Sequence, residues 1–346
     1  MGRLFIIGDT HFGLDVDKPM DVFGGQWADH ASKITQNWAK TVSDGDITVV
    51  NGDLSWGINR QETRCDLALL NSFAGRKILV KGNHDLWWDT MAKLSRQIQE
   101  EHLDSLLPLY NSAYFIPRAN ILICGTRGWK VPENADYQPS DAKILRREMM
   151  RFELSVNYGL ALVEKYRKGI GDRAAAGGTG AAGTGAGCAG AGGGGAAGGS
   201  DAGAQGILDF GGGAAVRSGA PAEGGEAARA AASNETGAAA EAAAAATDNT
   251  AAAENAAAAA LPPPEIIAVF HYPPFDYGTR HETDWAELLS RYHVKRCYFG
   301  HVHNAGSCKR NDAGEVLPVL QRDGVSYYLT AADYLGFEPM EIAFRR

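Results

Sequence analysis

Residues able to bind metals or move protons occur in five short clusters, and each cluster follows an apolar run. The runs are residues 4–7, 47–50, 78–80, 266–270 and 297–299, and the clusters after them are Gly8-Asp9-Thr10-His11, Asn51-Gly52-Asp53, Gly82-Asn83-His84-Asp85, His271 and Gly300-His301-Val302-His303. Short apolar runs bounded by glycine and polar residues are typical of buried strands. Because open α/β folds bind ligands beyond the carboxyl ends of their strands, we expect the clusters to meet at one sheet edge.

These residue types suit two divalent metal ions held close together. Such a centre needs hard or borderline ligands, a carboxylate that both ions share, and open positions for substrate and water. The clusters supply carboxylates, a carboxamide and imidazoles on Asp9, Asp53, Asn83, His11, His271, His301 and His303. A single Asp-x-His or His-x-His is usually an ordinary polar loop, but five such clusters, each after a strand-like run, favour a metal site.

The elements around the clusters alternate between strands and helices. Strands are expected at residues 3–8, 47–51, 77–81, 120–125, 266–270, 296–300, 325–330 and 340–344, and helices at residues 28–42, 59–73, 86–101, 140–168 and 284–292. This alternation predicts an α/β fold with helices packed on a sheet. We expect the last two strands to be antiparallel closing strands.

One long stretch departs from ordinary globular composition. Residues 172–264 consist almost entirely of alanine, glycine, threonine and proline, which cannot supply a second core. We predict a disordered insertion there, within a single catalytic domain of residues 1–171 and 265–346. The formal charge of −8 becomes −2 once the 9 acidic and 3 basic residues of this stretch are set aside. Near-neutrality gives no electrostatic footprint for nucleic acid, so such a partner is not expected, although the overall charge leaves a local basic cleft open.

The cysteines and the apolar runs predict the compartment. The five cysteines (Cys65, Cys124, Cys188, Cys297 and Cys308) form no C-x-x-C pair, and two of them lie in strand-like runs, so we expect reduced structural thiols. Reduced thiols are typical of the cytoplasm. No apolar stretch approaches the roughly 18 residues that span a bilayer, and the first strand begins too early for a signal peptide. We therefore predict a cytoplasmic protein that is not in a membrane.

The ordered motifs resemble those of the calcineurin-like metallophosphoesterases over residues 3–130 and 265–345. The resemblance implies a four-layer α/β/β/α sandwich and a hydrolase that cleaves phosphomonoester or phosphodiester bonds. It also implies two sets of ligands that share Asp53. Asp9, His11, Asp53 and His303 would hold the first ion, and Asp53, Asn83, His271 and His301 the second. Manganese, iron and zinc all suit this donor set.

The same resemblance implies a mechanism. Two cations about 3.5–4 Å apart bind a hydroxide between them, lower its pKa and stabilise charge as it attacks phosphorus. We expect His84 and Asp85 to be catalytic residues, because they match the family's non-ligand pair, in which the histidine contacts the phosphoryl group and protonates the leaving oxygen. An imidazole, with an ordinary pKa near 6.5, can give a proton at working pH.

The residues after Asp53 narrow the substrate class. Phosphoprotein phosphatases of the family have a further aspartate three residues after the bridging one and then an arginine, whereas here the sequence is Asp53-Leu54-Ser55-Trp56-Gly57. The chain is more similar to the bacterial small-molecule and phosphodiesterase branches, which implies a small phosphorylated or nucleotide-like substrate. Arg127, Trp129 and His281 are candidate substrate contacts, with a surface arginine and a core indole as the structural alternative.

Two other functions remain open. A nuclease of the same fold would need a basic groove, which the balanced charge does not support. A non-catalytic scaffold for protein binding would have lost ligands, whereas all seven are present here together with His84. The sequence predicts no oligomeric state.

Overall fold

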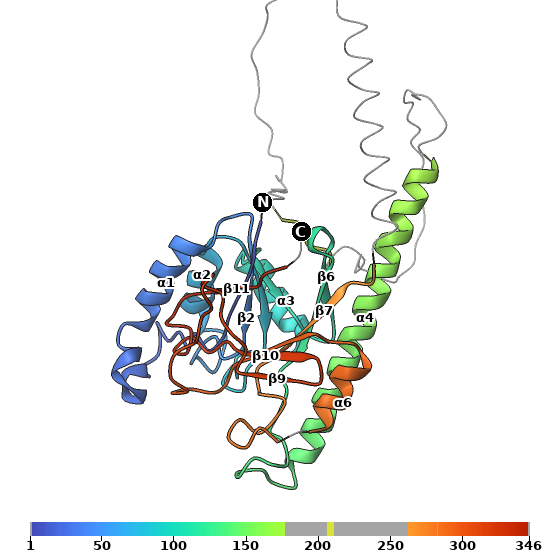
Figure 1. The fold of residues 1–346 in the computed structure, drawn as a ribbon. Coiled ribbons are helices and arrows are strands. Elements are labelled where there is room, and N and C mark those ends of the chain that lie inside the picture. The colour runs from blue at the N-terminus through green and yellow to red at the C-terminus, as the bar shows by residue number, and fades with distance from the viewer. Residues whose placement is uncertain (1, 177–205, 211–261, 282, 345–346) are drawn as a thin grey trace, which may run out of the picture. The chain divides into compact units, whose positions relative to one another are not determined.

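Two β-sheets form the centre of one compact unit (Figure 1). The computed structural model describes residues 2–176, 206–210, 262–281 and 283–344. The first unit contains the described residues up to Leu162, residues 206–210, and the described residues from Pro264 onward. The second unit contains, among the described residues, the chain from Val163 to Ala176 and the pair Pro262-Pro263.

The first sheet has five strands in the order β11-β1-β2-β3-β4. They are β1 (Leu4–Ile7), β2 (Ile47–Asn51), β3 (Arg76–Val80), β4 (Leu106–Pro108) and β11 (Met340–Glu341). Strands β1 to β4 run parallel, and β11 is antiparallel to β1. Nearly all side chains of β1, β2 and β3 are buried, as is typical of parallel strands that are covered on both faces.

Helices cover one face of this sheet. They are α1 (His30–Thr41), α2 (Arg64–Ser72) and α3 (Met91–Glu100), and Figure 1 shows α1 and α2 beside the first sheet. The Trp38 ring of α1 lies 5.1 Å from the ring of Phe73, which follows α2, and its Nε1 donates to the Ala74 carbonyl at 3.0 Å. This buried indole therefore joins α1 to the end of α2.

The second sheet has six strands in the order β5-β6-β7-β8-β10-β9. They are β5 (Ala113–Ile116), β6 (Ile121–Thr126), β7 (Glu265–Phe270), β8 (Arg296–Phe299), β9 (Leu320–Arg322) and β10 (Val325–Leu329). The four central strands are parallel, while β5 and β9 are antiparallel edge strands.

One helix and the first part of another, up to Leu162, pack on the outer face of the second sheet. They are α4 (Asp141–Ala176) and α6 (Asp284–Arg291). Phe152 of α4 is fully buried, and its ring lies 5.0 Å from Phe270 of β7 and 6.2 Å from Trp285 of α6. The two sheets and their outer helices make the four-layer α/β/β/α sandwich that the resemblance implied.

Contacts between residues at the strand ends join the two sheets. Gly8 forms a bridge with Ala331, and its N–H donates to the Thr330 carbonyl at 2.7 Å. Asn51, the last residue of β2, donates from Nδ2 to Thr330 Oγ1 at 3.1 Å. The carboxyl ends of β1, β2 and β10 therefore lie next to one another; the cluster pattern predicted this for β1 and β2 and did not include β10.

The predicted elements are present with shifted bounds. The helix expected at residues 86–101 begins at Met91, and the one expected at residues 59–73 begins at Arg64, because turns precede both. Strands β4, β5 and β9 were missed because they are only 3 or 4 residues long. The expected antiparallel pairing of the last strands is right for β11, which pairs with β1. It is wrong for β10 beside β8, which it joins in parallel, because residues 300–324 carry the chain back to the start of the sheet.

Most of the predicted insertion, residues 172–264, lies outside the described residues. Its described parts include the end of α4 and residues 206–210. The expectation of disorder does not hold for residues 206–210, because their backbone pairs with the edge strand β5. Phe115 donates its N–H to the Gly206 carbonyl at 2.7 Å, and Leu208 and Phe210 are buried.

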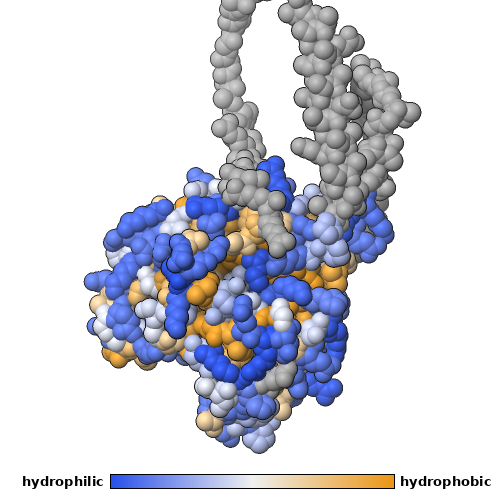
Figure 2. Space-filling view, viewed as in Figure 1, coloured by the Kyte–Doolittle hydropathy of each residue, from blue (hydrophilic) through white to orange (hydrophobic). Residues whose placement is uncertain are grey.

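The described cysteines and the surface agree with the composition. Cys65, Cys124, Cys297 and Cys308 are unpaired, with Cys124 and Cys297 buried in β6 and β8, while Cys188 lies outside the described residues. None of the described helices is both long enough and apolar enough to span a bilayer. Figure 2 shows hydrophilic residues over most of the visible coloured face, with smaller apolar areas between them.

Candidate metal centre

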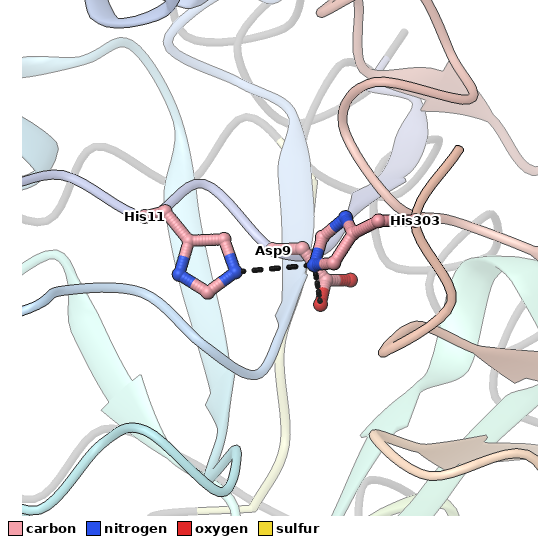
Figure 3. A group of neighbouring side chains, drawn as sticks. All are labelled: Asp9, His11 and His303. Carbon is pink, nitrogen blue, oxygen red and sulfur yellow. Dashed lines mark hydrogen bonds and ion pairs between the residues drawn. The ribbon is translucent and has the colours of Figure 1, made fainter. Parts of the chain in front are cut away.

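The loops that follow β1 and β8 bring Asp9, His11 and His303 together. Figure 3 shows the rings of His11 and His303 pointing toward each other, with the Asp9 carboxylate beside His303. The Nε2 atoms of the two histidines are 3.3 Å apart, and His303 Nε2 lies 3.7 Å from Asp9 Oδ1. One candidate ligand atom of each residue lies within 4.8 Å of the other two, so the three form a first ligand group.

A second ligand group contains Asp53, His271 and His301, on the loops after β2, β7 and β8. His271 Nε2 lies 3.3 Å from Asp53 Oδ2 and 2.7 Å from the amide oxygen of Asn83, which follows β3. Asn83 therefore lies beside the second group, to which it adds a neutral amide oxygen and no charge.

Asp53 lies between the two groups. Its Oδ2 is 3.3 Å from His271 Nε2 of the second group and 3.8 Å from His11 Nε2 of the first. The same carboxylate oxygen thus faces both sets of imidazoles. This is the position that a bridging carboxylate needs in a site with two metal ions.

The separations fit atoms that share a metal ion. Ligands bound at about 2.0–2.2 Å from one ion lie about 3–3.6 Å from each other at tetrahedral or octahedral angles. The His11–His303 and His271–Asp53 separations are both 3.3 Å. Carboxylate, carboxamide and imidazole donors suit Mn²⁺, Fe or Zn²⁺. The residues present therefore fit two divalent ions.

The backbone turns sharply at the ligands. Asp9, His11, Asp53 and His301 all have positive φ, between 44° and 69°. Non-glycine residues rarely adopt this region, and such residues gather at functional sites, where the surrounding structure holds them in place. A sharp turn directly after a strand points each side chain back across the sheet edge.

Two glycines next to metal ligands in the sequence, Gly82 and Gly300, allow the ligand loops to approach each other closely. A Cβ added at Gly82 would overlap the backbone nitrogen and the carboxylate of Asp53, and one added at Gly300 would overlap the carboxylate of Asp9. Any larger residue at either position would displace a ligand. The glycines beside the polar clusters are thus required by the packing of the site.

Burial and mutual attraction perturb the protonation of the ligands. Burial raises the pKa of Asp9 to about 7, against the attraction of His271 and His303. Burial also opposes a charge on His271, but Asp53 and Asp9 outweigh it and raise the pKa of His271 to about 9. Burial lowers the pKa of His301 to about 3, and the charge of His271 adds to the effect. In the metal-free protein, protons therefore balance the buried carboxylates.

Further residues orient the ligand imidazoles. Asp333 Oδ1 lies 3.2 Å from His303 Nδ1, and its Oδ2 accepts the Asn304 N–H at 2.9 Å. The Asn51 carbonyl lies 3.2 Å from His271 Nδ1. Such partners fix the ring orientation of a ligating histidine. Asp333 was not among the predicted site residues, although an acidic residue shortly after β10 follows the same pattern as the five clusters.

His84 lies beside the ligands without belonging to either group. Its backbone N–H donates to Asp53 Oδ1 at 2.8 Å, and its side chain is exposed. Its ring lies 5.8 Å from the His11 ring and 4.5 Å from Trp56, which also stacks on His11 at 4.6 Å. An exposed imidazole next to both groups is well placed to contact a substrate.

Asp85 has a different environment from His84. It is fully buried and accepts from the N–H groups of Gly82 at 2.7 Å, Leu54 at 2.9 Å and Ser55 at 3.3 Å, and from Trp87 Nε1 at 3.1 Å. These contacts occupy both carboxylate oxygens. Asp85 therefore ties the loop after β3 to the loop after β2, which suits a positioning residue, and its catalytic role stays a prediction.

Arg127 and Trp129 lie next to the second ligand group. The Arg127 carbonyl accepts the N–H of His271 at 3.1 Å, and the guanidinium lies 4.4 Å from the Trp129 ring centre. Trp129 lies 5.1 Å from Tyr272, whose ring lies 4.0 Å from His301. Arg127 therefore contacts the predicted ligand His271 directly, and Trp129 is separated from the predicted ligand His301 by the Tyr272 ring.

His281 is not brought to the ligand groups. Its side chain is 68% exposed and lies 3.6 Å from Glu133, in a separate cavity that Asp284 and Trp285 also line. The expectation of a substrate contact rested on the short distance in sequence from His271. The loop between them instead leads away to the start of α6.

Comparison with known proteins agrees with this geometry. Residues 2–147 match the family model described as calcineurin-like phosphoesterase. Residues 2–147 are therefore similar to the calcineurin-like phosphoesterases, and this match supports a hydrolase that acts on phosphoester bonds.

Two solved structures show partial similarity. One is a protein of unknown function from Aquifex aeolicus, with 21% identity, a TM-score of 0.29, and coverage of 42% of this chain and 72% of that chain. The other is a phosphopantetheinyl hydrolase from Mycobacterium tuberculosis, with 12% identity, a TM-score of 0.38, and coverage of 99% of this chain and 95% of that chain. No curated protein matches the chain.

Proposed function

We propose that the protein is a metal-dependent phosphohydrolase that cleaves a monoester or diester bond of a small phosphorylated or nucleotide-like substrate. The observation that carries the proposal is the shared position of Asp53 between two ligand groups, with exposed His84 beside both. Two bound divalent ions would supply a nucleophilic water near neutral pH and offset charge on the phosphoryl oxygens.

The chain's own residues divide into two ligand sets. Asp9, His11 and His303 would hold one ion together with Asp53. Asn83, His271 and His301 would hold the other, also with Asp53. The separations and donor types of both groups support this division. Residues 1–171 and 265–346 would form the catalytic domain, since every ligand lies within them.

His84 would act as the general acid. Burial lowers the pKa of its imidazole, and the charge of Asp53 opposes this shift. A phosphoryl dianion beside the ring would favour the charged imidazolium further. The substrate would therefore help His84 to hold the proton that the departing alkoxide needs. Trp56, packed between His84 and His11, would fix the ring position.

Hydrolysis of p-nitrophenyl phosphate and of bis(p-nitrophenyl) phosphate tests the proposal. Turnover should require added Mn²⁺ and should be lost after EDTA treatment. Asp53→Asn and His84→Ala should each lower kcat at least about 100-fold, the contribution expected of a positioned proton donor or charge. His281→Ala is the control, because its exposed side chain lies away from the ligands. Unchanged turnover in Asp53→Asn would refute the mechanism.

The same variants separate the rival functions. A nuclease would degrade a labelled oligonucleotide in a manner that depends on metal and on Asp53. A protein-binding scaffold would show no turnover of any of these compounds in the metal-loaded protein. The cytoplasmic location stays a prediction from the cysteine pattern.

A further inference from the structure

A second cavity lies beside the second ligand group, and its lining is rich in cations. It has a volume of about 250 Å³, and the charged residues that line it are Lys81, Arg127, Arg147, Arg151, Glu148 and Asp89. Four positive side chains thus face two negative ones. The cavity therefore carries a surplus of two positive charges, a field that attracts an anion.

The Glu148 carboxylate lies near three arginines of the cavity and can balance only one of their three positive charges. It is fully buried, and its Oε1 lies 2.6 Å from Arg151, 3.5 Å from Arg127 and 3.6 Å from Arg147. Its Oε2 accepts from Thr126 Oγ1 at 2.6 Å. One carboxylate balances one of the three guanidinium charges. Asp89 forms an ion pair with Lys93, which lies outside the cavity, so its negative charge is shared with that lysine.

Arg127 retains donor capacity. Its side chain is 17% exposed, and its Nε is buried with no hydrogen-bond partner among the described residues. The exposed part of the guanidinium can therefore donate to an anion in the cavity. Arginine side chains match the oxygens of a phosphoryl group in geometry as well as in charge.

The cavity adjoins the ligand loops through two of its members. Lys81 is followed directly by Gly82 and Asn83, and the Arg127 carbonyl accepts the N–H of His271. A substrate with one phosphoryl group at the two ligand groups can therefore extend another group toward the arginines. A surplus of two positive charges matches a phosphate monoester, which carries about −1.5 to −2 at neutral pH.

We propose that this cavity binds a second phosphoryl group of the substrate, so that the preferred substrates carry two phosphoryl groups. The inference rests on the proposed function and names the substrate class of that same site. The second group could be joined directly to the first, as in a diphosphate, or carried elsewhere, as in a bisphosphate. Both place the same chemistry in the cavity.

Arg147 and Arg146 provide a matched pair of variants. They are adjacent and exposed on α4, but only Arg147 lines the cavity and approaches Glu148. The substrates are p-nitrophenyl phosphate, adenosine 5′-diphosphate and adenosine 3′,5′-bisphosphate. Arg147→Gln should lower kcat/KM for at least one of the doubly phosphorylated substrates about tenfold more than for p-nitrophenyl phosphate, the loss expected for one charged hydrogen bond. Arg146→Gln should change neither, and the substrate that responds identifies the linkage.

A binding measurement keeps the inference separate from the proposed function. Calorimetry of adenosine 3′,5′-bisphosphate and adenosine 5′-diphosphate with the metal-loaded His84→Ala protein should show weaker binding when Arg127→Gln or Arg147→Gln is added. If p-nitrophenyl phosphate is hydrolysed but neither arginine variant changes selectivity or binding, the cavity assignment is wrong and the function stands. If nothing is hydrolysed but binding still depends on the arginines, the function is wrong and the anion site stands.

Discussion

Asp333 offers a sharp test of the ligand assignment, because it touches only one of the two groups. Its carboxylate holds His303 Nδ1 at 3.2 Å and the N–H of Asn304 at 2.9 Å. His303 belongs to the first ligand group and has no place in the second. Asp333→Ala should therefore weaken binding of one ion and leave the other ion bound as before.

The two hydrogen bonds set the size of the effect. A hydrogen bond to a charged group contributes about 1.5–3 kcal/mol, which corresponds to about a 10- to 150-fold change in binding. Loss of the residue that orients a ligating histidine typically lowers metal affinity 10- to 100-fold. Asp333→Ala removes both bonds, so we expect about a 100-fold loss. Asp333→Asn keeps one acceptor oxygen for His303, so we expect about a tenfold loss.

Isothermal titration of EDTA-treated protein with Mn²⁺ measures both affinities. Wild-type protein should bind two ions, and both Asp333 variants should show one unchanged and one weakened step. Asp312→Asn, in an exposed loop, is the control and should behave as wild type. Equal weakening of both steps, or no weakening of either, would contradict the division of the ligands into two groups.

Three further outcomes follow from the same geometry. The pKa of His271 is raised to about 9, and an imidazole must be neutral to bind a metal ion. Metal affinity, measured by titration at several pH values, should therefore increase about tenfold per pH unit from 7 to 9 and then level off. Gly82→Ala places a Cβ on Asp53 and should lower metal affinity at least about tenfold by the same titration, whereas Gly169→Ala, in helix α4 where the space is open, should not. Asp85→Ala leaves four donors without an acceptor and should lower the free energy of unfolding by about 3 kcal/mol in urea, and a loss below about 1 kcal/mol would contradict its positioning role.

The ligands could be predicted from the sequence because each lies within four residues of a strand end. Asp9 and His11 follow β1, and Asp53 follows β2. At such positions the sheet itself places the side chains, so the local pattern carries the three-dimensional information. The glycines in the same clusters have a role that only the structure shows, since the close approach of Gly82 to Asp53 leaves no space for a side chain.

Other features depend on contacts that no local pattern records. Asp85 was predicted to be catalytic because it completes the motif with His84, yet its carboxylate turns inward to backbone donors of the loop after β2. His281 was placed near the site because it lies ten residues after His271, but the intervening loop leads away from it. In both cases distance along the chain was a poor guide, because loop direction is decided by tertiary packing.

The anion cavity combines both kinds of information. Arg127 follows β6 and could be proposed from the sequence, whereas Glu148 and Arg151 reach it only because α4 packs across the sheet. The pairing of β6 with β7 aligns Thr126 with Phe270, which places Arg127 next to His271. The distance between the metal ligands and the arginines is therefore set by the register of two central strands rather than by a flexible loop. A site built in this way should select substrates by the spacing of their two phosphoryl groups, since the backbone that carries both binding positions is fixed by the sheet.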